Sequence, residues 1–178
     1  MSLSGVSVAA ASWFLALMFL DAWRHKIASL PRFKANLSAY RMVPKGMVGF
    51  AAGPLLLLEG LVGLALLGLE RIGLIGAALL LALYMCAIVT NLLRGRTEID
   101  CGCGDIPTPL SYRLVLRNLM LAGAAVLAIT VDLRPDQLTW RAGTVAVAAA
   151  LSAYGIYMSV EQLIANQGRF ARWHRGAA

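Results

Sequence analysis

The feature that most constrains this chain is a succession of apolar runs at about 6–23, 46–69, 72–93, 110–131 and 142–160. A helix rises 1.5 Å per residue, so about 20 apolar residues cross roughly 30 Å of hydrocarbon. Strands are disfavoured, because period-two alternation is missing and a lipid-exposed sheet edge is not tolerated. The sequence therefore predicts an all-α polytopic membrane protein with about five transmembrane helices and a four-helix core. The bundle is expected over 1–165, followed by a flexible basic tail over 166–178.

Composition supports this fold class. Of the 178 residues, 60% are hydrophobic and 14% are charged, whereas soluble domains have roughly 45–50% apolar and about 25% charged residues. The net charge of +7 resides in Lys and Arg residues that lie mainly between the apolar runs. This pattern excludes a soluble enzyme, a disordered chain and a nucleic-acid-binding domain, and it makes the lipid bilayer the first partner.

Basic residues also predict an orientation. Of the 16 Lys and Arg residues, 13 lie in the segments 24–46 and 94–117 and in the tail. The positive-inside rule places these alternate segments in the cytoplasm. The predicted topology in the cell (inner) membrane has the N-terminus outside, with the C-terminus and the loop before the fourth helix inside.

The segment between the first two helices has the pattern of a short amphipathic helix. Pro31 is suited to begin it and Pro44 to end it, while Phe33, Leu37 and Tyr40 recur at helical spacing. Such a helix suits the headgroup plane. The alternative is a basic cytoplasmic loop held near anionic lipid.

The most specific local feature is the loop Asp100-Cys101-Gly102-Cys103-Gly104 between the third and fourth helices. Glycine allows the backbone to bend until two sulfurs so close in sequence can meet. The small ring would be strained and easy to reduce, which favours electron exchange over structural stapling. Two inert thiols remain an alternative, and a metal site is disfavoured because structural zinc uses wider spacings and four ligands.

A third cysteine, Cys86, lies inside the third helix. It is either a small buried hydrophobe or a residue that relays electrons to the loop pair. Nearby Arg94 would favour the thiolate form of the pair, whereas the neighbouring aspartates would oppose it.

Polar residues at membrane depth form the second set of candidates. Glu59 lies mid-helix, where an acid costs about 2.5–3.5 kcal/mol to insert and normally faces a partner in the bundle. Its candidate roles are a proton relay, an ion-pair member, a hydrogen-bond acceptor for a quinone-like ligand, or a purely structural acid. Asn91, Arg117 and Asn118 lie near the cytoplasmic ends of the third and fourth helices. Gly49, Gly53, Gly60 and Gly63 predict close helix packing.

In this order, the residues resemble the methylamine-utilisation MauE family, within the wider group of DoxX-like membrane proteins. The resemblance is carried by His25-Lys26, Phe33, Tyr40, Pro44, Pro54, Glu59 and the segments 91–96, 100–104 and 116–119. It implies a small multi-pass protein of redox or maturation type that works beside a thioredoxin-like partner. The namesake is needed to mature the disulfide-rich small subunit of methylamine dehydrogenase. Related proteins occur in thiol and quinone settings, which makes a quinone the candidate cofactor.

Three functions compete. The first is a membrane thiol–disulfide oxidoreductase in which Cys101 and Cys103 exchange electrons. The second is a non-catalytic assembly or scaffold subunit, and the third is a small-solute carrier that uses Glu59. Because disulfides of exported proteins form outside the cytoplasm, a cytoplasmic cysteine loop would require a relay across the membrane or a cytoplasmic partner; otherwise the predicted topology is wrong.

Overall fold

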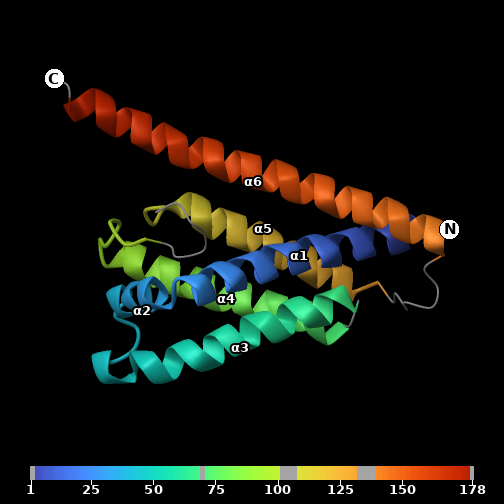
Figure 1. The fold of residues 1–178 in the computed structure, drawn as a ribbon, viewed down its shortest axis with the longest axis horizontal. Coiled ribbons are helices and arrows are strands. Elements are labelled where there is room, and N and C mark those ends of the chain that lie inside the picture. Colours follow the sequence, from blue (N-terminus) through green and yellow to red (C-terminus); the bar gives the residue numbers. More distant parts are fainter. Residues whose placement is uncertain (1–2, 69–70, 101–107, 132–138, 177–178) are drawn as a thin grey trace.

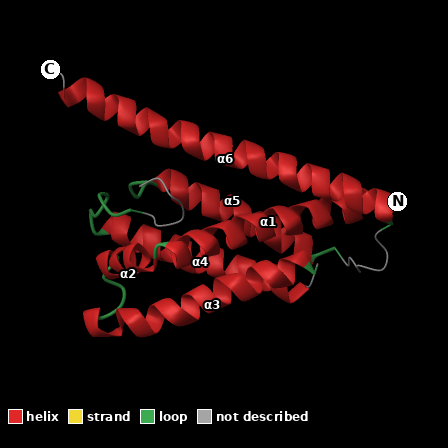
Figure 2. Cartoon of the chain, in the orientation of Figure 1, coloured by secondary structure: helices red, strands yellow, loops and turns green. Residues whose placement is uncertain are grey.

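The computed structural model describes residues 3–68, 71–100, 108–131 and 139–176. Every regular element among these residues is helical, as Figure 2 shows. In chain order the helices are α1 (Leu3–Ala28), α2 (Leu30–Ala39), the 3-10 turn η1 (Lys45–Met47), α3 (Val48–Leu67), α4 (Arg71–Leu93), α5 (Tyr112–Ile129) and α6 (Trp140–Gly176). Five of these helices are long and apolar enough to span a membrane. The predicted fold class is confirmed.

Four of the spanning helices enclose the core. Helix α1 packs on α3 and α5, and α4 packs on α3 and α5, so that the four close into a bundle (Figure 1). Helix α6 packs mainly on α1 and runs along one side of the bundle. Phe19, Leu66 and Leu80 are fully buried in the core, whereas large side chains such as Phe50 and Leu127 are exposed. An apolar surface around an apolar core marks a multi-pass membrane protein.

The two ends of the bundle differ in charge. Helix α2, the C-terminal end of α4 and the C-terminal end of α6 lie at one end, and the N-terminus lies at the other (Figure 1). The first end therefore carries the segments in which most Lys and Arg residues occur. This arrangement agrees with the alternation on which the predicted topology depends.

Two helices are longer than the sequence predicts. Helix α1 continues past Trp23 to Ala28, which brings Lys26 into the bundle. Helix α6 continues through residues 166–176, for which a flexible tail is expected. No proline interrupts that stretch, and adding a residue to an existing helix is far easier than nucleating a new one.

Helix α2 is the short helix predicted between the first two spans. Pro31 lies in its first turn, where the missing N–H costs nothing. Phe33 is buried, and Tyr40, just beyond the helix, packs against the bundle cluster formed by Ile88, Leu92, Leu110 and Leu114. The apolar face of α2 therefore packs on the bundle end, while Arg32 stays exposed at its surface.

A glycine ends α4 and directs the chain toward the cysteine segment. Gly95 has a φ of +70°, a left-handed conformation that glycine adopts without strain. Its N–H bonds to the carbonyl of Leu92, and the N–H of Arg96 bonds to that of Asn91, both at 2.9 Å. These two bonds form a Schellman motif.

The predicted small-residue surface on α3 is confirmed in its second half only. A Cβ atom on Gly60 would lie 2.9 Å from Trp23 Nε1, and one on Gly63 would lie 2.7 Å from Leu20 Cδ2, so both glycines allow α1 to approach closely. The expectation for Gly49 and Gly53 is wrong, because both are exposed and have open space beside them. Helix α1 reaches α3 only further along the bundle.

The close approach of α3 and α4 at Gly73 supplies a stability prediction. A Cβ on Gly73 would lie 2.7 Å from the backbone nitrogen of Leu66, and a backbone atom cannot rotate away. We expect Gly73→Ala to lower the free energy of unfolding by about 1–3 kcal/mol. Gly49→Ala, also in the first turn of its helix but beside open space, should be neutral or stabilising by up to about 1 kcal/mol. Thermal unfolding in detergent measures both; equal midpoints would contradict the close crossing.

Candidate functional site

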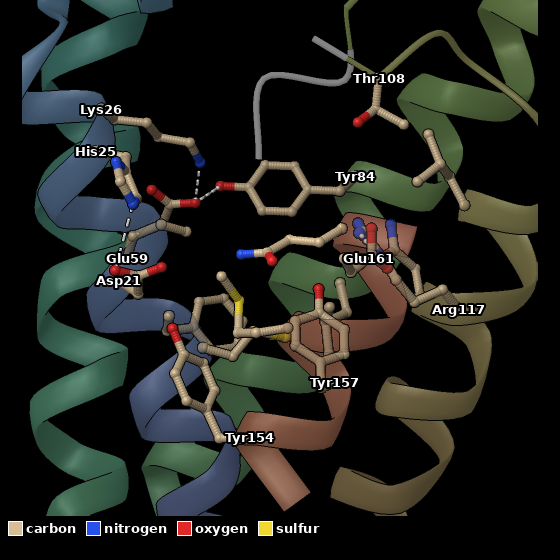
Figure 3. A pocket seen from close by; sticks show the side chains of 18 of the residues that line it. Asp21, His25, Lys26, Glu59, Tyr84, Thr108, Arg117, Tyr154, Tyr157 and Glu161 are labelled. Atoms are coloured by element: carbon tan, nitrogen blue, oxygen red, sulfur yellow. Dashed lines mark hydrogen bonds and ion pairs between the residues drawn. The ribbon is translucent and has the colours of Figure 1, made fainter. Parts of the chain in front are cut away.

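A buried polar cluster joins three helices near the end of the bundle that carries α2. Lys26 of α1 and Tyr84 of α4 both donate hydrogen bonds to Oε1 of Glu59 on α3. Figure 3 shows the three side chains pointing toward one another. Lys26 and Glu59 are only 6% and 1% exposed. An isolated buried charge is very costly, so the charge on each of these two side chains compensates the charge on the other.

Aromatic rings complete the surroundings of Lys26. Its ammonium nitrogen lies 5.0 Å from the ring centroid of Tyr84 and 5.4 Å from that of Phe33. At these distances the negative ring faces attract the cation. Helix α2 thus covers the ion pair through Phe33, which links the amphipathic helix to the interior charge.

The cluster borders a pocket of about 180 Å³. All five spanning helices contribute to its wall, together with Asp100 and Thr108 from the segment between α4 and α5. Its less polar wall contains Met18, Phe19, Leu81, Tyr154, Tyr157 and Met158. Tyr157 makes an edge contact with Phe14 and stacks beside Tyr154, with ring centroids 5.8 and 6.5 Å apart. The pocket therefore combines fixed aromatic walls with a few polar groups.

A second ion pair crosses the same pocket from α5 to α6. Arg117 Nη1 lies 3.3 Å from Glu161 Oε1 (Figure 3), and Arg117 Nη2 donates to Asn118 Oδ1 at 3.3 Å. On α1, Asp21 Oδ1 lies 3.0 Å from Arg24 Nη2 and 3.4 Å from His25 Nε2. The charged side chains around the pocket therefore lie in pairs of opposite sign.

Asp100 immediately precedes the cysteine segment and is held from two directions. Arg32 Nη2 and Asn36 Nδ2, both on α2, lie 3.0 and 3.4 Å from its Oδ2. The backbone N–H of Thr108 donates to its Oδ1 at 3.1 Å. Leu110 N–H also bonds to the carbonyl of Ile99 at 3.1 Å. The residues that flank 101–107 are thus tied to each other and to α2.

The structure brings three predicted site residues to one place. Glu59, Arg117 and Asn118 all line the pocket. Cys101 and Cys103 lie outside the described residues.

The remaining candidates lie elsewhere on α4 or just beyond its end. Cys86 is exposed on the outer surface of α4 and does not line the pocket. Asn91 is fully buried, and its Nδ2 bonds to the carbonyl of Ala87 at 3.0 Å, also away from the pocket. Exposed Arg94 has its Nη1 4.0 Å from Met42 Sδ. An electron relay through Cys86 gains no support from this placement.

Sequence reasoning missed Lys26 and Tyr84 as site residues. Lys26 follows the first apolar run closely, so the sequence places it in the basic segment 24–46. The signal for it was Glu59, because an acid at membrane depth requires a partner. Tyr84 is one aromatic residue in an apolar helix, and no spacing rule singles it out. No sequence pattern identifies the two α6 tyrosines, Tyr154 and Tyr157, as site residues either.

Comparisons with known proteins agree on one family. The family described as "Methylamine utilisation protein MauE" matches residues 4–131. The chain is 36% identical over 157 residues to a methylamine utilization protein MauE of Paracoccus denitrificans, which covers 84% of this chain and 83% of the relative. It is 34% identical over 160 residues to the protein of that name from Methylophilus methylotrophus, at 86% and 84% coverage. No solved structure matches the chain significantly.

Proposed function

Because the chain belongs to the MauE family, we propose that it is a membrane thiol–disulfide redox protein that serves protein maturation in methylamine utilisation. Cys101 and Cys103 form the exchanging pair, and the partner is a thioredoxin-like or other redox protein. The observation that carries the proposal is the position of the residues that flank the pair. The backbone N–H of Thr108 donates to Asp100, and both residues line the pocket, in which a few polar groups meet inside an apolar bundle.

The chemistry requires little beyond the two sulfurs. A thiolate of the partner attacks one sulfur of the Cys101–Cys103 disulfide, forms a mixed disulfide and releases the other sulfur as a thiolate. The partner's second thiol then displaces the bound cysteine. The partner leaves with a disulfide, and the pair has gained two electrons as two thiols. The same two steps in the reverse direction reduce a partner disulfide.

A quinone is the electron acceptor or donor class that we propose for the pair. The pocket residues fit its ring, because aromatic and thioether side chains form one wall and the buried amide of Asn118 offers a donor for an oxygen. When bound, a quinone supplies the uptake of two electrons and two protons. Lys26 and Tyr84 hold Glu59 in place at this wall, and α2 shields the ion pair from water.

Orientation belongs to the same proposal. The basic end of the bundle faces the cytoplasm, because Lys and Arg accumulate on that side of a membrane. The cysteine segment, which joins α4 to α5 at that end, then meets a cytoplasmic partner or passes reducing equivalents across the bilayer. Thiol labelling in intact and permeabilised cells tests the side directly.

Trapping of the mixed disulfide tests the function. With Cys103→Ser or Cys101→Ser, the remaining cysteine can attack a partner disulfide and form a mixed disulfide, but the pair has no second thiol to resolve it. We expect at least one of these variants to accumulate a disulfide-linked adduct in native membranes, removed by reductant and identified by mass spectrometry. Cys86→Ser, which keeps the pair and changes an exposed thiol, is the matched control and should accumulate none. Absence of an adduct from both single variants would refute the proposed exchange.

A further inference from the structure

Two buried polar atoms on the pocket wall indicate what the pocket binds. Glu59 Oε2 and Asn118 Nδ2 have no hydrogen-bond partner among the residues that the structure describes. Glu59 is 1% and Asn118 is 3% exposed, and both line the pocket. An unpartnered buried polar group costs about 1–3 kcal/mol. One atom is an acceptor and the other a donor, so a ligand that satisfies both must donate and accept.

The assignment of the amide atoms follows from a neighbour. Arg117 Nη2 is a donor and lies 3.3 Å from Asn118 Oδ1. A guanidinium has only donors, so the oxygen of the amide faces Arg117 and the NH₂ group is left for the pocket. Glu59 Oε1 is likewise occupied by Lys26 and Tyr84, which leaves Oε2 as the available acceptor.

The charges around the pocket argue against an ionic ligand. Each carboxylate on its wall has a cationic partner among the described residues: Asp21 with Arg24, Glu59 with Lys26, Asp100 with Arg32, and Glu161 with Arg117. A charged ligand would add an uncompensated charge to a site of low dielectric constant, where desolvation is expensive. The pocket is therefore suited to a neutral molecule.

Size and wall chemistry indicate a ring. The pocket of about 180 Å³ exceeds the roughly 150 Å³ of an apolar cavity that takes up benzene. Phe19, Tyr84 and Tyr157 supply aromatic surfaces, and Met18 and Met158 supply polarisable thioethers. A six-membered ring with small oxygen substituents matches this combination.

We infer that the pocket binds a neutral quinol, with its hydroxyl donating to Glu59 Oε2 and an oxygen accepting from Asn118 Nδ2. The identity of the ligand rests on the proposed function, whereas the hydrogen-bond pattern and neutrality rest on the pocket itself. An oxidised quinone has acceptors only, so it satisfies Asn118 and faces the carboxylate of Glu59 without a donor. The pocket therefore prefers the reduced form.

This preference has a redox consequence. Binding the quinol tenfold more tightly than the quinone raises the reduction potential of the bound couple by about 30 mV, since 29.6 mV corresponds to tenfold for two electrons. A higher potential favours the passage of electrons from thiols to the ligand. The pocket would thus shift the equilibrium of the exchange toward disulfide formation by the same amount.

Equilibrium binding to the full chain in detergent tests the inference, under anaerobic conditions. The probes are 2,3-dimethoxy-5-methylhydroquinone, the corresponding benzoquinone, benzoate and benzylammonium. We expect saturable binding of the hydroquinone, about tenfold weaker binding of the quinone, and weaker binding still of both ions. No saturable binding of the hydroquinone, which would mean a pocket filled by water only, would overturn the inference. Equal binding of quinone and hydroquinone, or tighter binding of either ion, would overturn it as well.

A pair of buried asparagines provides the matched variants. Asn118→Leu removes the amide in the pocket, whereas Asn91→Leu removes one that is equally buried and does not line it. We expect about tenfold weaker hydroquinone binding for Asn118→Leu and unchanged binding for Asn91→Leu, with thermal unfolding showing that both variants fold. Equal losses from the two would contradict the assigned contact. Repeating the titration with Cys101→Ser/Cys103→Ser separates the proposals, because ligand binding should persist when thiol exchange is lost.

Discussion

Replacing Cys101 and Cys103 together with serine is expected to reduce thiol–disulfide exchange to the background rate. Serine keeps the size and polarity of the side chain but cannot form a disulfide, so no mixed disulfide and no internal bond can arise. The measurement is reduction of a fluorogenic disulfide peptide by dithiol-primed chain in proteoliposomes. We expect a loss of at least about 100-fold, because no other thiol can replace the pair in its two-step exchange.

The control for this loss is the remaining cysteine. Cys86 is exposed on α4 and lies away from the pocket, so Cys86→Ser should retain the wild-type rate within about twofold. If exchange persists without Cys101 and Cys103 but is lost when Cys86 is replaced, Cys86 on α4 is the reacting thiol. Exchange that survives all three replacements would leave the chain without a redox role and favour an assembly subunit.

Glu59→Leu is expected to cause the largest loss of stability among single replacements in the bundle. It leaves Lys26 as a buried cation whose partner has gone, and breaking a buried pair in this way costs about 3–5 kcal/mol. Lys26→Met/Glu59→Leu should recover most of that loss, because an apolar pair of similar volume needs no compensation. Unfolding by denaturant in mixed micelles measures the free energy for each variant.

An exposed ion pair gives the comparison for the buried one. Arg32 lies 3.0 Å from Asp100, but its side chain is 42% exposed, so Arg32→Ala should cost about 1 kcal/mol or less. If Glu59→Leu costs no more than Arg32→Ala, the charge on Lys26 reaches water and the described burial is incorrect. If the double replacement recovers nothing, Glu59 acts through contacts other than Lys26.

The sequence predicts the architecture because the length and apolarity of each run, which can be counted along the chain, determine where the helices form. Apolar runs of helical length must cross the bilayer as helices, since every backbone polar group has to be satisfied within the segment. The helix α2 was equally predictable from two prolines and the spacing between Phe33 and Tyr40. Lengths were harder, because Lys26 and the residues after Asn166 are polar where helices usually end.

The sequence predicts only some of the site residues, and the reason is physical. Glu59 stands out because a lone acid in an apolar helix is costly, and Arg117 and Asn118 stand out for the same reason. Their partners Lys26, Tyr84 and Glu161 lie on other helices, and helix rotation, which no single run encodes, decides which faces meet. Gly49 and Gly60 illustrate the same point, since identical residues on α3 differ in whether α1 passes beside them.

The redox equilibrium of the cysteine pair tests the central claim most directly. The full chain would be equilibrated in membranes against glutathione buffers of graded potential and then alkylated, and its mass would be determined by mass spectrometry. We expect Cys101 and Cys103 to titrate together as one two-electron couple, so that the reduced pair carries two alkyl groups and the oxidised pair none, while alkylation of Cys86 does not change. Thiols that stay reduced across the whole range, or that take up glutathione singly without ever bonding to each other, would contradict this expectation.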